Sequence, residues 1–198
     1  MNTVCVTPIF VSLMLLAVSP AAAEPPRPNL LLIFVDNVGY GDLGCYGNRE
    51  AITPRIDRLA GEGVRCLDFY IASPSCSPSR GAILTGRHPE RNGLNYQMSS
   101  NPDLHREGLP LTETTLAGRL KASGYVTGLV GKWHLGSEPA FHPQKRGFDE
   151  FFGFLGGAHS YIQPAGFMRG TEPVKEMDYS TEAFGREAIG FMEGQRGE

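Results

Sequence analysis

The sequence predicts an α/β fold with a mainly parallel sheet flanked by helices. Short apolar segments alternate with amphipathic ones along the chain, and glycines, prolines and capping residues separate them. This alternation is typical of parallel strands joined by helical crossovers. The 198 residues, of which 41% are hydrophobic and 20% charged, are enough for one substantial core.

Three apolar segments are expected to form strands. Residues 30–35 are a continuous apolar run, which is typical of a strand covered on both faces. Residues 64–70 and 125–130 are the other two expected strands.

Four helices are expected between and after these strands. The first has Thr53 as its N-cap and Pro54 at its first position, and glycines 61 and 63 end it. The second follows Cys76, with Ser77 as its expected N-cap. The third and fourth cover residues 111–122 and 181–192.

The charge of the chain argues against nucleic acid as a partner. The net charge is −3 and the pI is near 6.0. The sequence therefore carries no basic field that would attract nucleic acid or an anionic membrane.

The first 23 residues differ in composition from the rest. They hold no acidic or basic side chain, an apolar run over residues 9–18, and three alanines before Glu24. This pattern predicts a secretory signal peptide, residues 1–23, and a mature chain, residues 24–198, that is periplasmic or secreted. An uncleaved anchor is the alternative, but the apolar run is short for a membrane span, so no stable membrane insertion is expected.

Four cysteines are present, and Cys5 would leave with the signal peptide. The remaining three are an odd number, which in an exported chain suggests one thiol with a special fate. We expect that thiol to be Cys76. Cys45 and Cys66 either pair or serve as two small, buried apolar side chains.

The most informative stretch is Cys76-Ser77-Pro78-Ser79-Arg80. Pro78 suits the first turn of a helix and Ser77 is the expected N-cap. Cys76 is then at a helix N-terminus, where backbone N–H groups favour an anion. Arg80, four residues on, lies on the same face and can hold the nucleophile or an anion through paired hydrogen bonds. The plain alternative is a capped helix with a buried cysteine and a surface arginine.

Three polar motifs follow predicted strands. Asp36-Asn37 and residues 131–134 come directly after strands, and Cys76 comes after a short loop from one. Ligands of such sheets bind beyond the carboxyl ends of the strands. The three motifs are therefore expected to meet in one active site.

The frame around Cys76 closely resembles the signature of the sulfatases, and the similarity runs from about Pro28 to the end of the chain. The resemblance implies an alkaline-phosphatase-like sulfatase fold. It also implies that a separate formylglycine-generating enzyme oxidises Cys76 to formylglycine, an aldehyde that is hydrated to a diol. One diol hydroxyl attacks sulfur and the other later expels sulfate. The pattern is most similar to arylsulfatases and N-acetylgalactosamine-6-sulfatases.

The segment from Pro28 to Gly44 resembles the opening segment of sulfatases, where two consecutive aspartates usually bind a divalent cation, commonly Ca²⁺. The resemblance implies that Asp36, Asn37 and the modified Cys76 hold this cation. Asn37 replaces the second aspartate, and its amide oxygen is an acceptable calcium ligand that supplies no charge, so weaker affinity is expected. In the alternative reading, Asp36 and Asn37 merely cap a turn.

The segment from Gly131 to Gly136 resembles a second sulfatase block, in which the lysine contacts sulfate and the histidine contacts the diol. Lys132 and His134 are two residues apart, so in an extended chain they share one side while Trp133 packs away from them. Lys132 would offer its charge to the sulfate oxygens. His134 would take the proton whose loss lets the diol release sulfate.

Residues 141–153 are also similar to sulfatases. Beyond them, Ala158 stands where many members carry a serine before a histidine. His159 is therefore either a substrate-binding residue or a structural or exposed histidine.

Together these motifs imply hydrolysis of the sulfate ester of a small molecule or glycan, with Arg80, Lys132 and the cation stabilising charge on the sulfate oxygens. Sulfatases are longer than this chain, and their other metal ligands come from later sequence, so we expect an amino-terminal portion with an incomplete site. The rivals are a related phosphoester or phosphonate hydrolase and a degenerate sulfatase-like domain that binds sulfated glycans.

Overall fold

The structure is a computed structural model that describes residues 27–101 and 107–195. The chain divides into one unit that ends at Asn37 and a larger unit that begins at Val38. The expected signal peptide lies outside the described residues. Within those residues, no helix is both long and apolar enough to cross a membrane.

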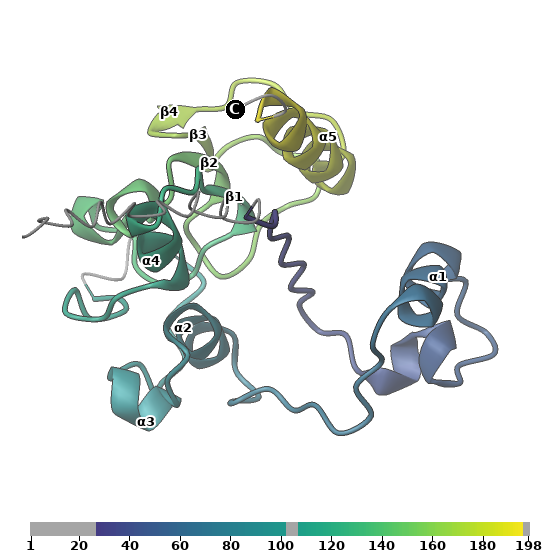
Figure 1. Cartoon of the computed structure of the whole chain (residues 1–198). Helices are drawn as coiled ribbons and strands as arrows, with labels where there is room; N and C mark the ends of the chain where they lie inside the picture. The colour runs from purple at the N-terminus through teal and green to yellow at the C-terminus, as the bar shows by residue number, and fades with distance from the viewer. Residues whose placement is uncertain (1–26, 102–106, 196–198) are drawn as a thin grey trace, which may run out of the picture. The chain divides into compact units, whose positions relative to one another are not determined.

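The larger unit is built on a mixed sheet of four strands (Figure 1). The strands are β1 (Gly128–Lys132), β2 (Glu150–Phe154), β3 (Phe167–Arg169) and β4 (Glu172–Pro173), and they lie in that order. The pair β1 and β2 is parallel, with Lys132 opposite Phe154, whereas the pairs β2–β3 and β3–β4 are antiparallel. The predicted α/β fold with a helix-flanked sheet is confirmed, and its parallel pair includes Lys132, one residue of the candidate site.

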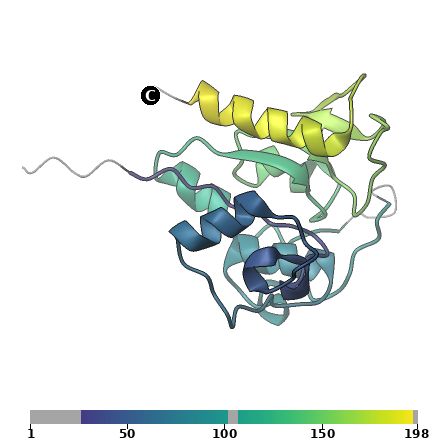
Figure 2. The same cartoon turned by 90° about the vertical axis from the view of Figure 1, so that its right-hand side faces the viewer.

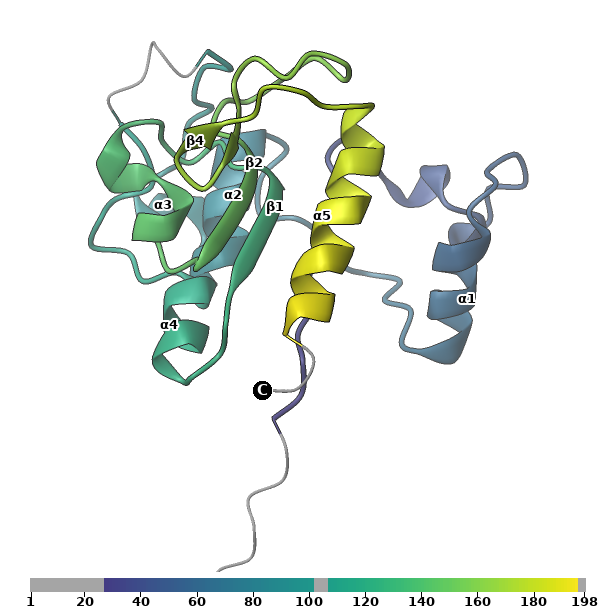
Figure 3. The same cartoon turned by 90° about the horizontal axis from the view of Figure 1, so that it is seen from above.

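Helices lie on both faces of this sheet. Helix α5 (Ser180–Gly194) runs along one face, as Figures 2 and 3 both show. Helices α2 (Cys76–Thr85) and α4 (Leu116–Ala122) lie on the opposite side of β1 and β2 (Figure 3). Because side chains of a strand alternate between its faces, neighbouring residues of β1 serve different cores. Leu129 packs toward one cluster and Val130 toward the other.

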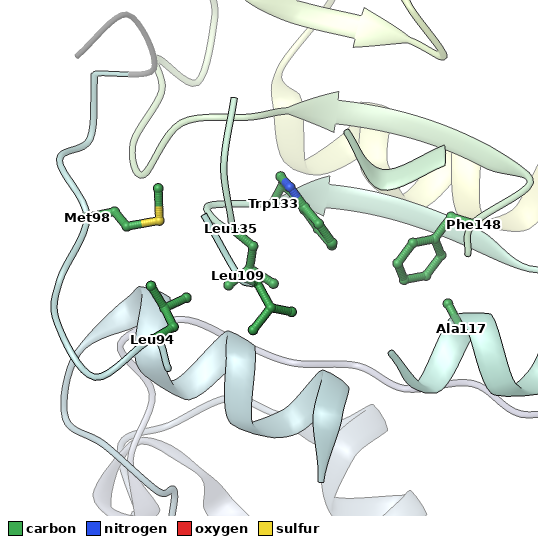
Figure 4. Close-up of a cluster of buried hydrophobic side chains, with 7 residues drawn as sticks. All are labelled: Leu94, Met98, Leu109, Ala117, Trp133, Leu135 and Phe148. Carbon is green, nitrogen blue, oxygen red and sulfur yellow. The ribbon is translucent and has the colours of Figure 1, made fainter. Parts of the chain in front are cut away.

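The first core joins the ends of β1, α2 and α4 (Figure 4). Trp133 and Leu135, just beyond β1, are its central members, and both are almost completely buried. The Trp133 Nε1–H donates to the backbone carbonyl of Phe141 at 3.0 Å, so the polar end of this large ring is satisfied inside the core. The other buried members are Leu94, Met98, Leu109, Ala117 and Phe148.

The second core lies between the sheet and α5 and is mostly aromatic. Phe152, Phe154 and Phe167 pack there against Ala183 and Phe184 of the helix. An ion pair lies at the edge of this layer. Nη1 and Nη2 of Arg169 donate to the two carboxylate oxygens of Glu187, each at 2.6 Å. The amphipathic face of α5 is therefore held by aromatic packing and fixed in register by one bidentate pair.

The remaining helices are short. The first predicted helix is confirmed as α1 (Pro54–Glu62), with Thr53 at the N-cap and Gly63 at the C-cap, while glycine 61 lies inside it. In the part of the chain that the structure describes, the others are α3 (Pro89–Asn92) and the 3₁₀ turns η1 (Tyr40–Asp42), η2 (Gly44–Tyr46), η4 (Pro139–Phe141) and η5 (Pro143–Lys145).

Two predicted strands are wrong. Residues 30–35 and 64–70 are irregular, and most of their apolar side chains are exposed. A strand is stable only when a neighbouring strand takes its backbone hydrogen bonds and when another layer covers its apolar face. Within the described residues, neither segment has such a neighbour, so strong apolar character alone does not make a strand here.

Two boundaries also move. The third helix begins at Leu116 instead of residue 111, because Thr115 takes the N-cap and its hydroxyl oxygen accepts from Gly118 N at 3.0 Å. The strand expected at 125–130 runs from Gly128 to Lys132, because Tyr125 N donates to Leu120 O and thus still belongs to the turn that ends α4. The late helix is confirmed as α5 with slightly wider bounds.

Candidate active site

The candidate nucleophile, Cys76, is the first residue of α2, and its half-buried thiol is not part of a disulfide. Ser75 holds the N-cap position, so the prediction that Ser77 caps the helix is wrong. The helix can begin two residues earlier than predicted because Pro78 fits any position of the first turn, where an N–H has no partner within the helix. Cys76 is thus inside the positive end of the helix dipole, the position expected of a group that handles anions.

Arg80 connects this helix to the sheet. Its Nη1 donates to the backbone carbonyl of Lys132 at 2.7 Å. Lys132 is the last residue of β1 and is half-buried. The bond brings together two predicted site residues that are 52 residues apart in the sequence.

The backbone bends sharply at the end of β1. Trp133 N and His134 N donate to Phe154 O and Leu155 O at 3.0 Å, so the pairing with β2 continues for two residues after Lys132. His134 then has a φ of 57°, in the left-handed region that few residues other than glycine adopt. Strain of this kind persists only where the surroundings enforce it, and it is concentrated at functional sites.

The His134 ring is 2% exposed and is held by backbone atoms. Its Nε2 lies 3.2 Å from Met98 O and 2.9 Å from Ser99 O. Both oxygens can only accept, so Nε2 carries the hydrogen. The Nδ1 atom is also buried, and within the described residues it has no hydrogen-bond partner.

A glycine lies against the same edge of this ring. A Cβ atom added to Gly157 would lie 2.5 Å from His134 Nε2, which is far inside van der Waals contact. Gly157 N also donates to Ser100 O at 3.1 Å. The Nε2 edge of the ring is therefore enclosed by the backbone of residues 98–100 and by a residue that must lack a side chain.

The electrostatics of His134 favour the neutral ring. Burial lowers its pKa below the ordinary value, and the positive charges of Lys132 and Arg80 lower the pKa further. The carbonyls of Ser99 and Met98 act in the opposite direction. The result is a neutral imidazole close to two cations, an arrangement that can attract an anion and accept a proton from it.

His159 lies elsewhere. Its Nδ1 is 2.9 Å from Ser160 O and its Nε2 is 2.5 Å from Ala165 O, and the ring packs edge-on against Phe167. Both nitrogens are thus engaged within its own loop, and the ring is part of the aromatic layer of the second core. The substrate-binding role of His159 stays a prediction.

The predicted cation ligands Asp36 and Asn37 are in the smaller unit. They form a turn directly after an extended segment, both are exposed, and Asn37 has a φ of 57°. An extended chain would point adjacent side chains in opposite directions, and this turn removes that restriction. One carboxylate and one amide oxygen are hard donors that suit Ca²⁺. Within the described residues, no group of three or more His, Cys, Asp or Glu side chains is arranged to hold a metal.

Cys45 and Cys66 are free thiols. Cys45 is half-buried and Cys66 is exposed, so the interpretation of both as buried apolar side chains is wrong for Cys66. The backbone carbonyls of these two cysteines accept hydrogen bonds. The Tyr46 hydroxyl donates to Cys66 O at 2.9 Å, and Arg65 Nη1 donates to Cys45 O.

Sequence reasoning missed the parts of the site that act through the backbone. The carbonyls of residues 98–100 hold His134, but a carbonyl leaves no mark on residue type. Gly157 gave the one usable signal, because it stands in a Gly-Gly pair directly before Ala158. Such a pair indicates close approach of another group.

Comparison with known proteins identifies the family. The sulfatase family model matches residues 28–198. The chain belongs to the sulfatase family. It is 49% identical over 138 residues to N-acetylgalactosamine-6-sulfatase from Homo sapiens, an alignment that covers 67% of this chain and 26% of that protein. It is 54% identical over 140 residues to arylsulfatase A from Bos taurus, covering 70% of this chain and 27% of that protein.

Solved sulfatase structures share the fold. The structure described as Ps i-CgsB in complex with k-i-k-neocarrahexaose superposes with a TM-score of 0.78 at 36% identity, covering 82% of this chain and 40% of that chain. The PsFucS1 sulfatase from Pseudoalteromonas sp. superposes with a TM-score of 0.67 at 28% identity, covering 81% and 39%. The sulfatase chain described here spans about a quarter of the length of the curated relatives it matches.

Proposed function

We propose that the protein hydrolyses sulfate esters and that residue 76, converted from cysteine to formylglycine, is the nucleophile. The observation that supports this most directly is the position of Cys76 at the N-terminus of a helix whose Arg80 is bonded to the end of β1, where Lys132 and the buried His134 follow. The hydrated aldehyde supplies one hydroxyl that attacks sulfur and a second that expels sulfate.

The other residues stabilise charge and move a proton. Arg80 and Lys132 supply positive charge and would face the sulfate oxygens, which gain charge in the transition state. His134 is neutral because burial lowers its pKa, so its Nδ1 lone pair is ready to accept the diol proton. Such a group placed in a water-poor site contributes typically 10²–10⁴-fold to the rate.

A divalent cation fits the oxygen donors of Asp36 and Asn37. We propose that these two residues and the modified residue 76 hold Ca²⁺, which when bound polarises the sulfate oxygens. Asn37 contributes a neutral ligand, so a smaller charge holds the ion here than a pair of aspartates would supply.

The substrate class is a sulfated small molecule or a sulfated glycan. The relatives named above include enzymes described as acting on N-acetylgalactosamine 6-sulfate and aryl sulfates, and one solved relative is described in complex with a carrageenan-type oligosaccharide. We also propose a secreted or periplasmic location and a formylglycine-generating enzyme as partner. Because the chain spans about a quarter of these relatives, we expect the isolated 198 residues to turn over aryl sulfates slowly or not at all.

The neutral ligand Asn37 favours a second candidate, a degenerate sulfatase-like domain that binds sulfated glycans without cleaving them. Turnover of sulfate esters by a longer form separates the two candidates. Binding of a sulfated oligosaccharide with no turnover would support the second. Faster turnover of a phosphate ester would instead support a related phosphoester hydrolase.

The chain contains its own control for the modification test. Trypsin cleavage after Arg65 and Arg80 releases residues 66–80, which include both Cys66 and Cys76. After expression with a formylglycine-generating enzyme and alkylation of thiols, we expect one alkylated cysteine, Cys66, and an aldehyde at residue 76. A Pro78→Ala variant, which breaks the recognition frame, should give two alkylated cysteines. Two alkylated cysteines in the unmodified frame would contradict the proposal.

A further inference from the structure

Residues 97–100 contact three parts of the site that are far apart in sequence. They come shortly after α3 in the sequence. They contact the start of α2, the ring of His134 and the backbone of Gly157. The bond from Ser77 N to Gln97 Oε1 caps the first turn of α2, whereas the remaining contacts neither close a helix nor pair a strand. The segment is therefore a candidate for a role beyond the fold itself.

Two hydrogen bonds tie the segment to the nucleophile helix. Ser77 N donates to Gln97 Oε1 at 3.2 Å, and Met98 N donates to Ser77 Oγ at 3.3 Å. Ser77 is fully buried next to Cys76, and the Met98 side chain is anchored in the first core. The start of α2 and residues 97–98 thus form a reciprocal pair of bonds, one from each chain segment.

The other end of the segment holds the candidate base. The carbonyls of Met98 and Ser99 both accept from His134 Nε2, at 3.2 and 2.9 Å. The carbonyl of Ser100 accepts from Gly157 N, which keeps Gly157 against the Nε2 edge of the ring. The carbonyls of Met98 and Ser99 therefore determine which nitrogen bears the hydrogen, and the Ser100 bond keeps the neighbouring backbone in place.

We propose that residues 97–100 are a positioning segment, in which Gln97 and Ser77 couple the nucleophile helix to His134 and keep the ring hydrogen on Nε2. The Nδ1 lone pair is then the one available as proton acceptor. The proposed role deepens the sulfatase mechanism and rests on it, because only a base needs a defined free lone pair. A ring that served packing alone would be indifferent to the tautomer.

Nitrogen-15 NMR of the histidine rings in the full chain tests this directly. Protonated and unprotonated ring nitrogens have well-separated shifts, and a His134→Asn variant identifies which signals belong to residue 134. The unmodified chain should show one fixed tautomer with hydrogen on Nε2. Hydrogen on Nδ1, or rapid exchange between both tautomers, would overturn the proposal. The measurement needs neither formylglycine nor substrate, so a failure of the proposed sulfatase activity leaves its result unaffected.

Two variants remove one coupling bond each. Gln97→Ala deletes the acceptor for Ser77 N, and Ser77→Ala deletes the acceptor for Met98 N. In both variants, the two ring-nitrogen shifts of His134 should move toward each other. Gln97→Glu replaces the amide oxygen with a carboxylate oxygen that can also accept, so this variant should keep the shifts of the unmodified chain. Gln97 is exposed, so its removal leaves the core intact.

The matched control is Asn95→Ala. Asn95 lies two residues before Gln97 and loses a comparable surface bond, 2.8 Å long, to Glu90. Its ring shifts should equal those of the unmodified chain. Unchanged His134 shifts in both Gln97→Ala and Ser77→Ala, or an equal change in Asn95→Ala, would show that the coupling does not exist.

Discussion

The guanidinium of Arg80 and the backbone carbonyl of Lys132 lie 2.7 Å apart and form a hydrogen bond between α2 and the end of β1. One nitrogen of the arginine is thus committed to the fold, while the candidate nucleophile Cys76 lies about one turn away at the start of the same helix. The residue carries two roles, and substitutions separate them.

Arg80→Lys keeps the charge but not the planar fork, so the bond to Lys132 O is lost. A hydrogen bond to a charged group contributes about 1.5–3 kcal/mol, and we expect the free energy of unfolding to fall by about that amount. Urea unfolding with an unchanged m-value would measure it. Arg91→Lys, on the exposed side of α3, should change the stability by less than about 0.5 kcal/mol. Equal effects of the two variants would contradict the assigned bond.

The stability of the chain should fall as the pH drops below neutrality. The folded-state pKa of His134 is below its ordinary value because the ring is buried, so below about pH 6.5 the unfolded chain binds a proton that the folded chain does not. Each such group adds a slope of at most about 1.4 kcal/mol per pH unit between its two pKa values. Burial lowers the pKa of His142 as well.

Urea unfolding between about pH 5 and pH 8 would measure this slope. His134→Asn, in which asparagine tolerates the left-handed backbone, should remove part of it, and a second substitution at His142 should remove more. The same slope in the unmodified chain and in His134→Asn would show that the ring is not held neutral.

Gly157→Ala should displace the ring of the candidate base, His134, because it adds one methyl group next to that ring. The new Cβ would overlap His134 Nε2 at 2.5 Å, and forced repacking of this kind costs about 1–3 kcal/mol. We expect lower stability and displaced His134 ring signals. The control is Gly185→Ala, in the exposed middle of α5 with nothing within 4 Å of the added atom. This control should raise the free energy of unfolding by about 0.5–1 kcal/mol. A Gly157→Ala variant that is as stable as the unmodified chain while Gly185→Ala is destabilised would contradict the predicted contact.

Asn37→Asp should strengthen cation binding. Aspartate also tolerates the left-handed φ of 57° at this position, and it adds one charge to the ligand set. We expect the affinity for Ca²⁺, measured by isothermal titration calorimetry, to rise by about tenfold or more. Asp36→Ala should abolish the same signal. Binding that is unaffected by both changes would exclude this turn as part of the cation site.

The sequence supported predictions wherever a local signal determines the structure. Proline and threonine at the start of α1, the Cys76 frame of α2 and the apolar period of α5 all predict elements that the structure contains. The first two signals act within one helical turn, so no distant partner is needed to satisfy them. The apolar period of α5 extends over several turns and is satisfied by the aromatic second core.

Strands and backbone contacts were harder to predict because their causes lie outside the segment. Residues 30–35 have strong strand character, yet a strand exists only with a partner. The position of His134 was predicted from its motif, whereas the carbonyls of Met98 and Ser99 that hold it come from a segment 35 and 36 residues away. Any residue type at positions 98 and 99 would provide the same backbone carbonyl, so the residue type gives no signal.

The exposed apolar segment of residues 30–35 also affects how this chain behaves at high concentration. Leu30, Leu31, Leu32, Ile33 and Val35 are all more than half exposed. A six-residue apolar window without charge or proline is the type of sequence that stacks into intermolecular cross-β assemblies. Chains of this length made alone are therefore expected to aggregate through residues 30–35, and a lysine in place of Ile33 should delay the onset of fibril formation.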